Sequence, residues 1–330
     1  MPHCEDTNVH LYTSGTSNIG ILNMDSNEVN LLSLCKALYD KSIQLCVPTT
    51  KFAFIQTGSL IKGCAEFSIK FVQYIPSTNK IDLKGNCGNA IVASYMYIRE
   101  KYGVEKTKIY TINTGKTSDL SYIGRDENGN EQIATEFLSP AGSITKSILP
   151  LGAATNRFSI PEIGIVEVSV VDAGNPYVWM RSETVSKEDS ALWGNKEFNR
   201  MMIVREYVQR ILQIEQKSVF PKVAVVAPRN APNHDIQAKM ITVPTWHPTF
   251  ALTGLVCMCA ALSIEGSIVN DMAPHMTYGR SNSVNVLTPG GIMYVEFSLS
   301  NHGILYSVAI VQKVKKIGGV TVDYSELELV

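Results

Sequence analysis

The residues Gly85-Asn86-Cys87-Gly88-Asn89, followed by the apolar run from Ala90 to Ile98, decide the fold that we expect. Glycines lie close on both sides of the thiol, so the backbone can approach a ligand closely there. The apolar run predicts a helix whose first N–H groups point at whatever lies beside Cys87. A thiol at a helix N-terminus is also placed where its thiolate is favoured. We interpret this stretch as the centre of an active site.

The bulk composition is that of an ordinary globular protein. The 330 residues are 45% hydrophobic and 18% charged, with a formal net charge of -1, which gives no sign of a nucleic-acid partner. No apolar run reaches the roughly 20 residues that span a bilayer. The seven cysteines are irregularly spaced without a CxxC pair, and the first residues are polar. We therefore expect reduced thiols, no zinc site and a cytoplasmic location.

The order of predicted elements is mainly strands, with helices at a few places. We expect a strand, turn and strand over 10–22 and a helix capped by Ser26 or Asn27 that ends near Tyr39. A strand over 51–56 should lead into a small-residue loop, 57–63, that carries Lys62. Later strands are predicted at 108–113, 131–138, 143–149 and 166–171. The polar segment 181–200 is interpreted as a linker or surface loop, and a helix is expected over about 197–216. Another helix, 251–262, is apolar on every side and should be buried all round.

The two halves of the chain echo each other. Each places a strand and a loop before an apolar helix opened by small residues, at 87–90 and at 251–254. This echo predicts an α+β fold of two pseudo-symmetric domains, each a β-barrel-like sheet around a central helix, with a cleft between them. We place the N-terminal domain at 1–160, completed by a strand at about 304–330, and the C-terminal domain at 161–303. Two helix N-termini would suit a carboxylate-bearing ligand.

This arrangement resembles the diaminopimelate epimerase fold and, more specifically, the PrpF and methylitaconate isomerase family. The resemblance covers most of the chain and rests on motifs in the same order. These are Thr16-Ser17 for the end of RGGTS, Lys62 for the Lys of TSK, residues 85–89 for GNCGN, residues 140–143 and 149–152 for PAGS…LPTG, residues 172–176 for DAxNP, and Thr253-Gly254 for the second-helix TG. Two positions depart from the family pattern. Thr13 stands where the family has Arg, and Thr288-Pro289-Gly290-Gly291 stands where it has HPSG.

The resemblance implies a cofactor-free and metal-free isomerase. Its expected reaction moves a double bond by a 1,3-proton shift, or changes cis to trans, in an unsaturated carboxylic acid or related carbonyl metabolite. Lys62 and Cys87 are implied to exchange the proton, in roles that stay open, with Ser17 assisting. Residues expected at the substrate are Thr16, Asp82, Asn86, Gly88, Asn89, His247, Thr253, Gly254 and Gly290. The expected partner is a small molecule, neither a membrane nor a nucleic acid, and a homodimer is left open.

Each of these residues also has a purely structural interpretation. Lys62 can be an exposed loop lysine, Cys87 a buried structural thiol and Asp82 a turn cap, while Asn89 and Thr253 can be ordinary helix caps. Two other functions compete with isomerisation. The departures from the family pattern favour cyclisation or rearrangement of a larger metabolite in a specialised pathway. The second competing function is that of a binding protein without turnover. The joint presence of Ser17, Lys62 and Cys87 argues against it.

Overall fold

The computed structural model describes residues 7–23, 30–61, 65–273 and 280–322, with the backbone alone for 7 and 59–61. The chain divides into two compact units: unit 1 consists of residues 1–136 and 311–330, and unit 2 of residues 137–310. Within the described ranges, no helix is long and apolar enough to cross a membrane. Each unit has its own central helix.

Unit 1 is built from strands that are mostly antiparallel neighbours. They are β1 (Thr7–Ser14), β2 (Ser17–Asn23), β3 (Lys51–Ile61), β4 (Ala65–Ile75), β5 (Lys80–Asp82), β6 (Lys106–Thr111), β7 (Lys116–Arg125), most of β8 (Glu131–Leu138) and the second part of β17 (Leu305–Val322). β1 pairs with β2 through a two-residue turn, and with β17 in the register Ser14↔Val314. β2 and β3 are parallel, so the crossover between them carries the helix α1 (Leu31–Gln44). β3 pairs with β4, which pairs in turn with β6.

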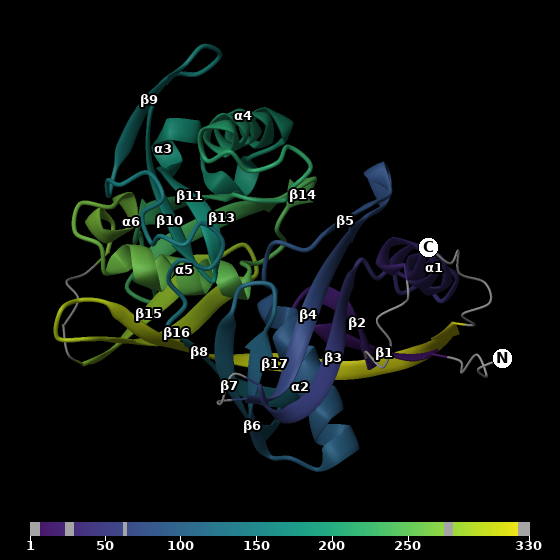
Figure 1. Ribbon diagram of the computed structural model, residues 1–330. Coiled ribbons are helices and arrows are strands. Elements are labelled where there is room, and N and C mark those ends of the chain that lie inside the picture. Colours follow the sequence, from purple (N-terminus) through teal and green to yellow (C-terminus); the bar gives the residue numbers. More distant parts are fainter. Residues whose placement is uncertain (1–6, 24–29, 62–64, 274–279, 323–330) are drawn as a thin grey trace. The chain divides into compact units, whose positions relative to one another are not determined.

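The central helix of unit 1 is α2 (Gly88–Tyr102). Its residues are buried continuously from Gly88 to Ile98, and it contacts strands β1, β2, β3, β4, β6 and β7 (Figure 1). It ends as a helix C-terminus prefers, with Arg99 and Lys101 in the last turn and Gly103 at a φ of 70°. The predicted buried helix directly after Cys87 is therefore present.

Unit 2 repeats this plan around α5 (Leu252–Leu262), which is buried along its whole length and contacts β10, β11 and α6. Its elements are β9 (Asn156–Ile160), β10 (Gly164–Ala173), β11 (Asn175–Arg181), α3 (Ser182–Val185), α4 (Asn195–Ile211), β12 (Lys222–Pro228), β13 (Ile236–Thr242), β14 (Thr245–Trp246), α6 (Ile268–Asp271), β15 (Ser281–Thr288), β16 (Gly291–Leu299) and the first part of β17. The apolar face of α4 packs Met201, Val204 and Val208 against Val223 and Val225 of β12.

Several predicted elements differ from the structure, each for a local reason. The helix α1 begins after Asn30, whose side-chain oxygen accepts from the backbone N–H groups of Leu32 and Ser33, and it continues to Gln44 rather than Tyr39. The predicted caps, Ser26 and Asn27, lie outside the described residues. β3 extends to Ile61 because it keeps pairing with β4, so most of the predicted loop at 57–63 is strand.

The predicted strand at 143–149 is wrong, since this segment is a loop. Its backbone is held by the buried carboxylate of Asp172, which accepts from the N–H groups of Ile144 and Thr145 at 2.8 Å and 2.6 Å. The predicted linker at 181–200 contains the short helix α3 and the start of α4.

The division between the units also differs from the predicted 160/161 boundary. It falls after Glu136, because β9 pairs with β10 and Ala141 bridges to Ala173, which ties the residues after 136 to unit 2. The C-terminal strand joins unit 1 from Val311 onward.

Candidate functional site

Cys87 occupies the N-cap position of α2, in extended backbone with a φ of -133°. Its side chain is half-buried and makes no capping hydrogen bond, while its carbonyl oxygen accepts from the N–H of Ile91 at 3.0 Å. The side-chain oxygen of the preceding residue, Asn86, accepts from the N–H of Cys87 at 2.8 Å. The thiol therefore stands at the positive end of a buried helix, where first-turn N–H groups suit an anion.

A hydrogen-bonded chain of side chains lies beside this helix start. Lys51, the first residue of β3, donates from Nζ to Oγ of Ser17, the first residue of β2, at 2.6 Å. Nδ2 of Asn89 also lies 3.4 Å from Oγ of Ser17, and Oδ1 of Asn89 accepts from Nε2 of Gln312 at 3.3 Å. Ser17, Asn89 and Gln312 are buried, and Lys51 is partly exposed. The chain brings together a cation, a hydroxyl and the helix that begins after Cys87.

Gly15 in the β1–β2 turn fits closely against this chain. It has a φ of 56°, and a Cβ there would lie 2.7 Å from Nε2 of Gln312 and 3.2 Å from Oδ1 of Asn89. A side chain at this position would therefore be strained and would displace the two amides. The next residue, Thr16, is exposed in the turn.

The remaining predicted residues of unit 1 have different surroundings. Asp82 is buried at the end of β5, and its Oδ1 accepts from the N–H of Lys84 at 2.9 Å, as an Asx turn does. Gly88 is the first residue of α2 and is buried. Lys62 lies outside the described residues.

In unit 2 the helix α5 begins after Ala251, again without a side-chain cap. Thr253 is buried in its first turn, and its Oγ1 accepts from Nδ2 of Asn175 at 3.0 Å and lies 3.4 Å from the hydroxyl of Tyr177. A Cβ at Gly254 would lie 2.7 Å from the ring of Phe250, so the helix passes close to that ring. Neither Thr253 nor Asn89 is the N-cap of its helix, because each side chain bonds to a neighbouring strand or turn.

His247 and Gly290 are brought together by Thr249. The Nδ1 atom of the buried His247 accepts from the N–H of Thr249 at 3.2 Å. A Cβ at Gly290, in the turn between β15 and β16, would lie 2.2 Å from Cγ2 of Thr249. This close approach explains a glycine at this position, and it places the two predicted residues on adjoining loops.

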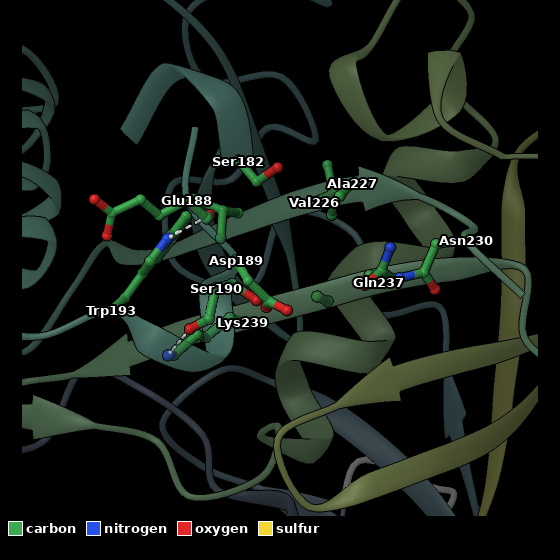
Figure 2. A pocket seen from close by; sticks show the side chains of 12 residues that line it. Ser182, Glu188, Asp189, Ser190, Trp193, Val226, Ala227, Asn230, Gln237 and Lys239 are labelled. Atoms are coloured by element: carbon green, nitrogen blue, oxygen red, sulfur yellow. Dashed lines mark hydrogen bonds between the residues drawn. The ribbon is translucent and has the colours of Figure 1, made fainter. Parts of the chain in front are cut away.

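Unit 2 also contains a pocket of about 310 Å³ beside β12 and β13 (Figure 2). Lys239 of β13 lies at this pocket, where its Nζ lies 4.5 Å from the ring centroid of Trp246 and donates to the carbonyl oxygen of Ser190. Burial lowers the pKa of Lys239. None of the predicted site residues lines this pocket. The predicted site residues therefore lie elsewhere within each unit.

Two thiols in α5 belong to the core rather than to a site. Cys257 and Cys259 are fully buried, and burial raises the pKa of both thiols. No group of three or more His, Cys, Asp or Glu that could hold a metal ion is found in the described parts of the chain.

Sequence reasoning missed Lys51, Gln312 and Asn175 as site residues. A signal for Lys51 was available, because Thr49-Thr50-Lys51 fits the Thr-Ser-Lys segment of the resembling family better than Leu60-Ile61-Lys62 does. Asn175 lies in the 172–176 segment that resembles DAxNP, but its pairing with Thr253 was not apparent, because the two residues lie far apart in the sequence. Gln312 carried no such signal, because its partner, Asn89, is also distant in the sequence.

Comparison with known proteins agrees with this architecture. A methylitaconate-delta-isomerase crystal structure matches 98% of this chain and 97% of its own, with a TM-score of 0.74 at 18% identity. A hydroxyproline epimerase from Agrobacterium vitis matches with a TM-score of 0.63 at 10% identity, over 98% of this chain and 94% of its own. The predicted two-domain, epimerase-like α+β fold is confirmed.

The sequence comparisons identify the family. The family model described as PrpF protein matches residues 123–323, which is more than half of the chain. This chain belongs to the PrpF family. Its relatives include the 3-methylitaconate isomerase of Eubacterium barkeri, 22% identical over 84% of this chain and 84% of that protein. YraM of Bacillus subtilis, provisionally named as an isomerase, is 24% identical over 60% of this chain, and the match spans 65% of YraM. These relatives bear out the predicted isomerase class.

Proposed function

We propose that this chain is a cofactor-independent isomerase that moves a C=C bond in an unsaturated carboxylic acid by a 1,3-proton shift. Membership of the PrpF family and relatives named as isomerases support the reaction class. The observation that carries the proposal to particular residues is the 2.6 Å contact between Nζ of Lys51 and Oγ of Ser17. This pair reaches α2 through Asn89, two residues after Cys87.

The reaction needs two proton carriers and a fixed charge. A base removes a proton from the carbon allylic to the double bond, and the electron pair spreads into a dienolate over the carboxylate. An acid then returns a proton to the far carbon, so the double bond moves and no atom is gained or lost. Rotation within the dienolate before the proton returns would give cis–trans isomerisation instead. Preorganised hydrogen-bond donors stabilise such an intermediate, and a single donor contributes about 3 kcal/mol.

We assign the proton carriers to Lys51 and Cys87, with Ser17 as the group that holds Lys51 or relays its proton. Lys62 stays a competing candidate for the lysine role. The uncapped start of α5, at Thr253 and Gly254, is the proposed carboxylate-binding part of unit 2, because first-turn N–H groups and a hydroxyl suit an anion. Binding by Thr16, Asn86, His247 and Gly290 stays a prediction.

Solvent exchange tests the assignment directly. Incubation with 3-methylitaconate in D₂O should place one solvent deuterium in each product molecule, detected by NMR. Removal of a positioned acid or base typically costs about 10²–10⁴-fold in rate. We therefore expect Lys51→Ala and Cys87→Ser each to lose about that much, and Ser17→Ala to lose less. Lys36→Ala, at an exposed position of α1, is the matched control and should keep full exchange.

Parallel measurement of Lys62→Ala separates the two lysines. Full exchange by Lys51→Ala together with lost exchange by Lys62→Ala would return the role to Lys62. Full exchange by Cys87→Ser would remove the thiol from the mechanism. A wild-type protein that exchanges no deuterium into 3-methylitaconate or related unsaturated mono- and dicarboxylic acids would contradict the proposed reaction.

A further inference from the structure

The hydroxyl of Thr253 lies within hydrogen-bonding distance of two groups of its own unit, and across the contact with Tyr177 either hydroxyl can donate. A hydroxyl carries one hydrogen to donate and two lone pairs that accept. Nδ2 of Asn175 can only donate, so at 3.0 Å it occupies one lone pair of Oγ1. The hydroxyl of Tyr177, at 3.4 Å, can occupy the second. When both donate, the hydrogen of Thr253 has to point away from both residues.

These two residues are held firmly. Asn175 and Tyr177 lie two residues apart on β11, and both are buried, with exposed fractions of 2% and 0%. The ring of Tyr177 stacks on Trp179 at 5.5 Å and 22°, and Trp179 stacks on Phe250 at 6.2 Å and 20°. Phe250 lies against Gly254, where a Cβ would be 2.7 Å from its ring. The stack therefore runs from the strand to the first turn of α5 and fixes where Thr253 stands.

We propose that Asn175 and Tyr177 are positioning residues that make Thr253 an obligatory hydrogen-bond donor at the start of α5. A hydroxyl that can only donate favours ligand groups that only accept, such as a carboxylate, over groups that also donate, such as an amide or an alcohol. This inference rests on the proposed function, because it deepens the assignment of carboxylate binding to Thr253. It adds the reason why this helix start selects an anion.

A double-mutant cycle tests whether Asn175 acts through Thr253. Dissociation constants for 3-methylitaconate are measured by calorimetry for the wild type, Thr253→Val, Asn175→Ala and the double variant. Thr253→Val keeps the shape and removes the hydroxyl, and it should weaken binding by about 10-fold or more, as expected for a hydrogen bond to a charged group. Asn175→Ala should weaken binding by about 3- to 10-fold in the wild type and by less than about 2-fold in Thr253→Val.

Tyr177→Phe provides a second cycle that keeps the ring stack, and it decides the question if Asn175→Ala does not fold. Thr253→Ser keeps the hydroxyl and should bind within about 3-fold of the wild type. An equal loss from Asn175→Ala and from Tyr177→Phe in both backgrounds would overturn the proposal, and so would unchanged binding by Thr253→Val. Binding without deuterium exchange would contradict the proposed reaction alone. A wild-type protein that binds no unsaturated carboxylate would contradict both.

Discussion

The side chain of Asn89 connects the start of α2 to two neighbouring strands. It stands in the first turn of α2, where an asparagine would commonly be expected to cap the helix. Its amide instead lies between Ser17 of β2 and Gln312 of β17, at 3.4 Å and 3.3 Å. The N-cap residue, Cys87, makes no side-chain bond to the first-turn N–H groups of α2, and Asn89 ties Ser17 to the helix. The same side chain thus defines the turn and leaves the helix start open to an anion.

The turn glycine that contacts this amide gives a prediction at the scale of single residues. Gly15→Ala should destabilise the protein by about 1–2 kcal/mol, because a Cβ disfavours the left-handed backbone. It should also lower the rate of deuterium exchange, because the methyl group would displace the amides of Gln312 and Asn89. Urea unfolding and the exchange assay measure the two effects.

Gly103→Ala is the matched control for this prediction. Gly103 has a φ of 70°, but nothing lies within 4 Å of the Cβ that would be added. Gly103→Ala should therefore lower the free energy of unfolding about as much as Gly15→Ala does, while the rate of deuterium exchange into the substrate stays that of the wild type. Equal exchange rates in both variants would show that the contact of Gly15 with the amides does not matter to the site.

The candidate site was partly predictable at this scale. Cys87 and Ser17 could be found because local sequence marks them: a thiol between glycines before an apolar run, and a tight turn between strands. Lys62 was predicted because it was matched to the Lys of the family's TSK segment, and it stays a competing candidate beside Lys51. The pairings of Gln312 with Asn89 and of Asn175 with Thr253 could not be found, because a single sequence does not show which distant side chains meet.

At the scale of elements, the buried carboxylate of Asp172 organises a whole loop. It is fully buried at the end of β10, and it accepts from the hydroxyl groups of Ser143 and Thr145 as well as from two backbone N–H groups. Buried carboxylates are costly unless such donors surround them. The loop therefore has one strongly favoured conformation without having regular secondary structure.

Substitutions at Asp172 should show a graded loss of stability. Asp172→Ala leaves two backbone N–H groups without their acceptor and should cost about 3–5 kcal/mol. Asp172→Asn should cost less, about 1–3 kcal/mol, because its carbonyl can keep the N–H donors while the hydroxyl of Ser143 turns to accept. Urea denaturation curves measure both values.

Asp189→Ala serves as the comparison, since Asp189 is an exposed carboxylate that accepts from the N–H of Ala191 at 2.9 Å. Its loss should be about 1 kcal/mol or less. A destabilisation by Asp172→Ala no greater than this would show that the carboxylate does not hold the loop.

Elements with a strong local pattern were predictable, and this loop was not. The buried helices α2 and α5 and the β1–β2 hairpin follow from apolar runs and turn residues, and they agree with the structure. The segment 143–149 has isoleucines that resemble a strand, but its backbone bonds to a carboxylate 27 and 28 residues away. Side-chain acceptors at such separations leave no periodic trace in the sequence.

At the scale of the whole molecule, the strand β17 belongs to both units. Its first part pairs with β16 at Glu296↔Ala309 in unit 2, and its second part pairs with β1 at Ser14↔Val314 in unit 1. The sequence predicted that a strand at about 304–330 completes the first domain. The boundary at Glu136 was less accessible, because it depends on long-range pairings such as Ala141 with Ala173.

This division predicts that a destabilising substitution in the second part of β17 increases hydrogen exchange mainly in unit 1. Val314 is 1% exposed, so Val314→Asp buries a charge and should cost about 3–5 kcal/mol. Hydrogen exchange read by mass spectrometry should then speed up in β1 and β2 more than in β10 and β11. Val311→Asp, at a position of the same strand that is 53% exposed, should leave exchange near that of the wild type. Equal acceleration in both units would contradict the division.

The shared strand also sets the order in which the chain can fold as a ribosome makes it. Residues 311–322 leave the ribosome after all of unit 2, yet β1 needs them as its pairing partner and Asn89 needs the amide of Gln312. Domains usually fold as units in the order of synthesis. Here the later-made unit can be complete first, while the nascent unit 1 waits with the edge of β1 unpaired. During that interval the unpaired edge of β1 can pair with other chains. We therefore expect the nascent chain to be most prone to aggregation just before residues 311–322 are synthesised.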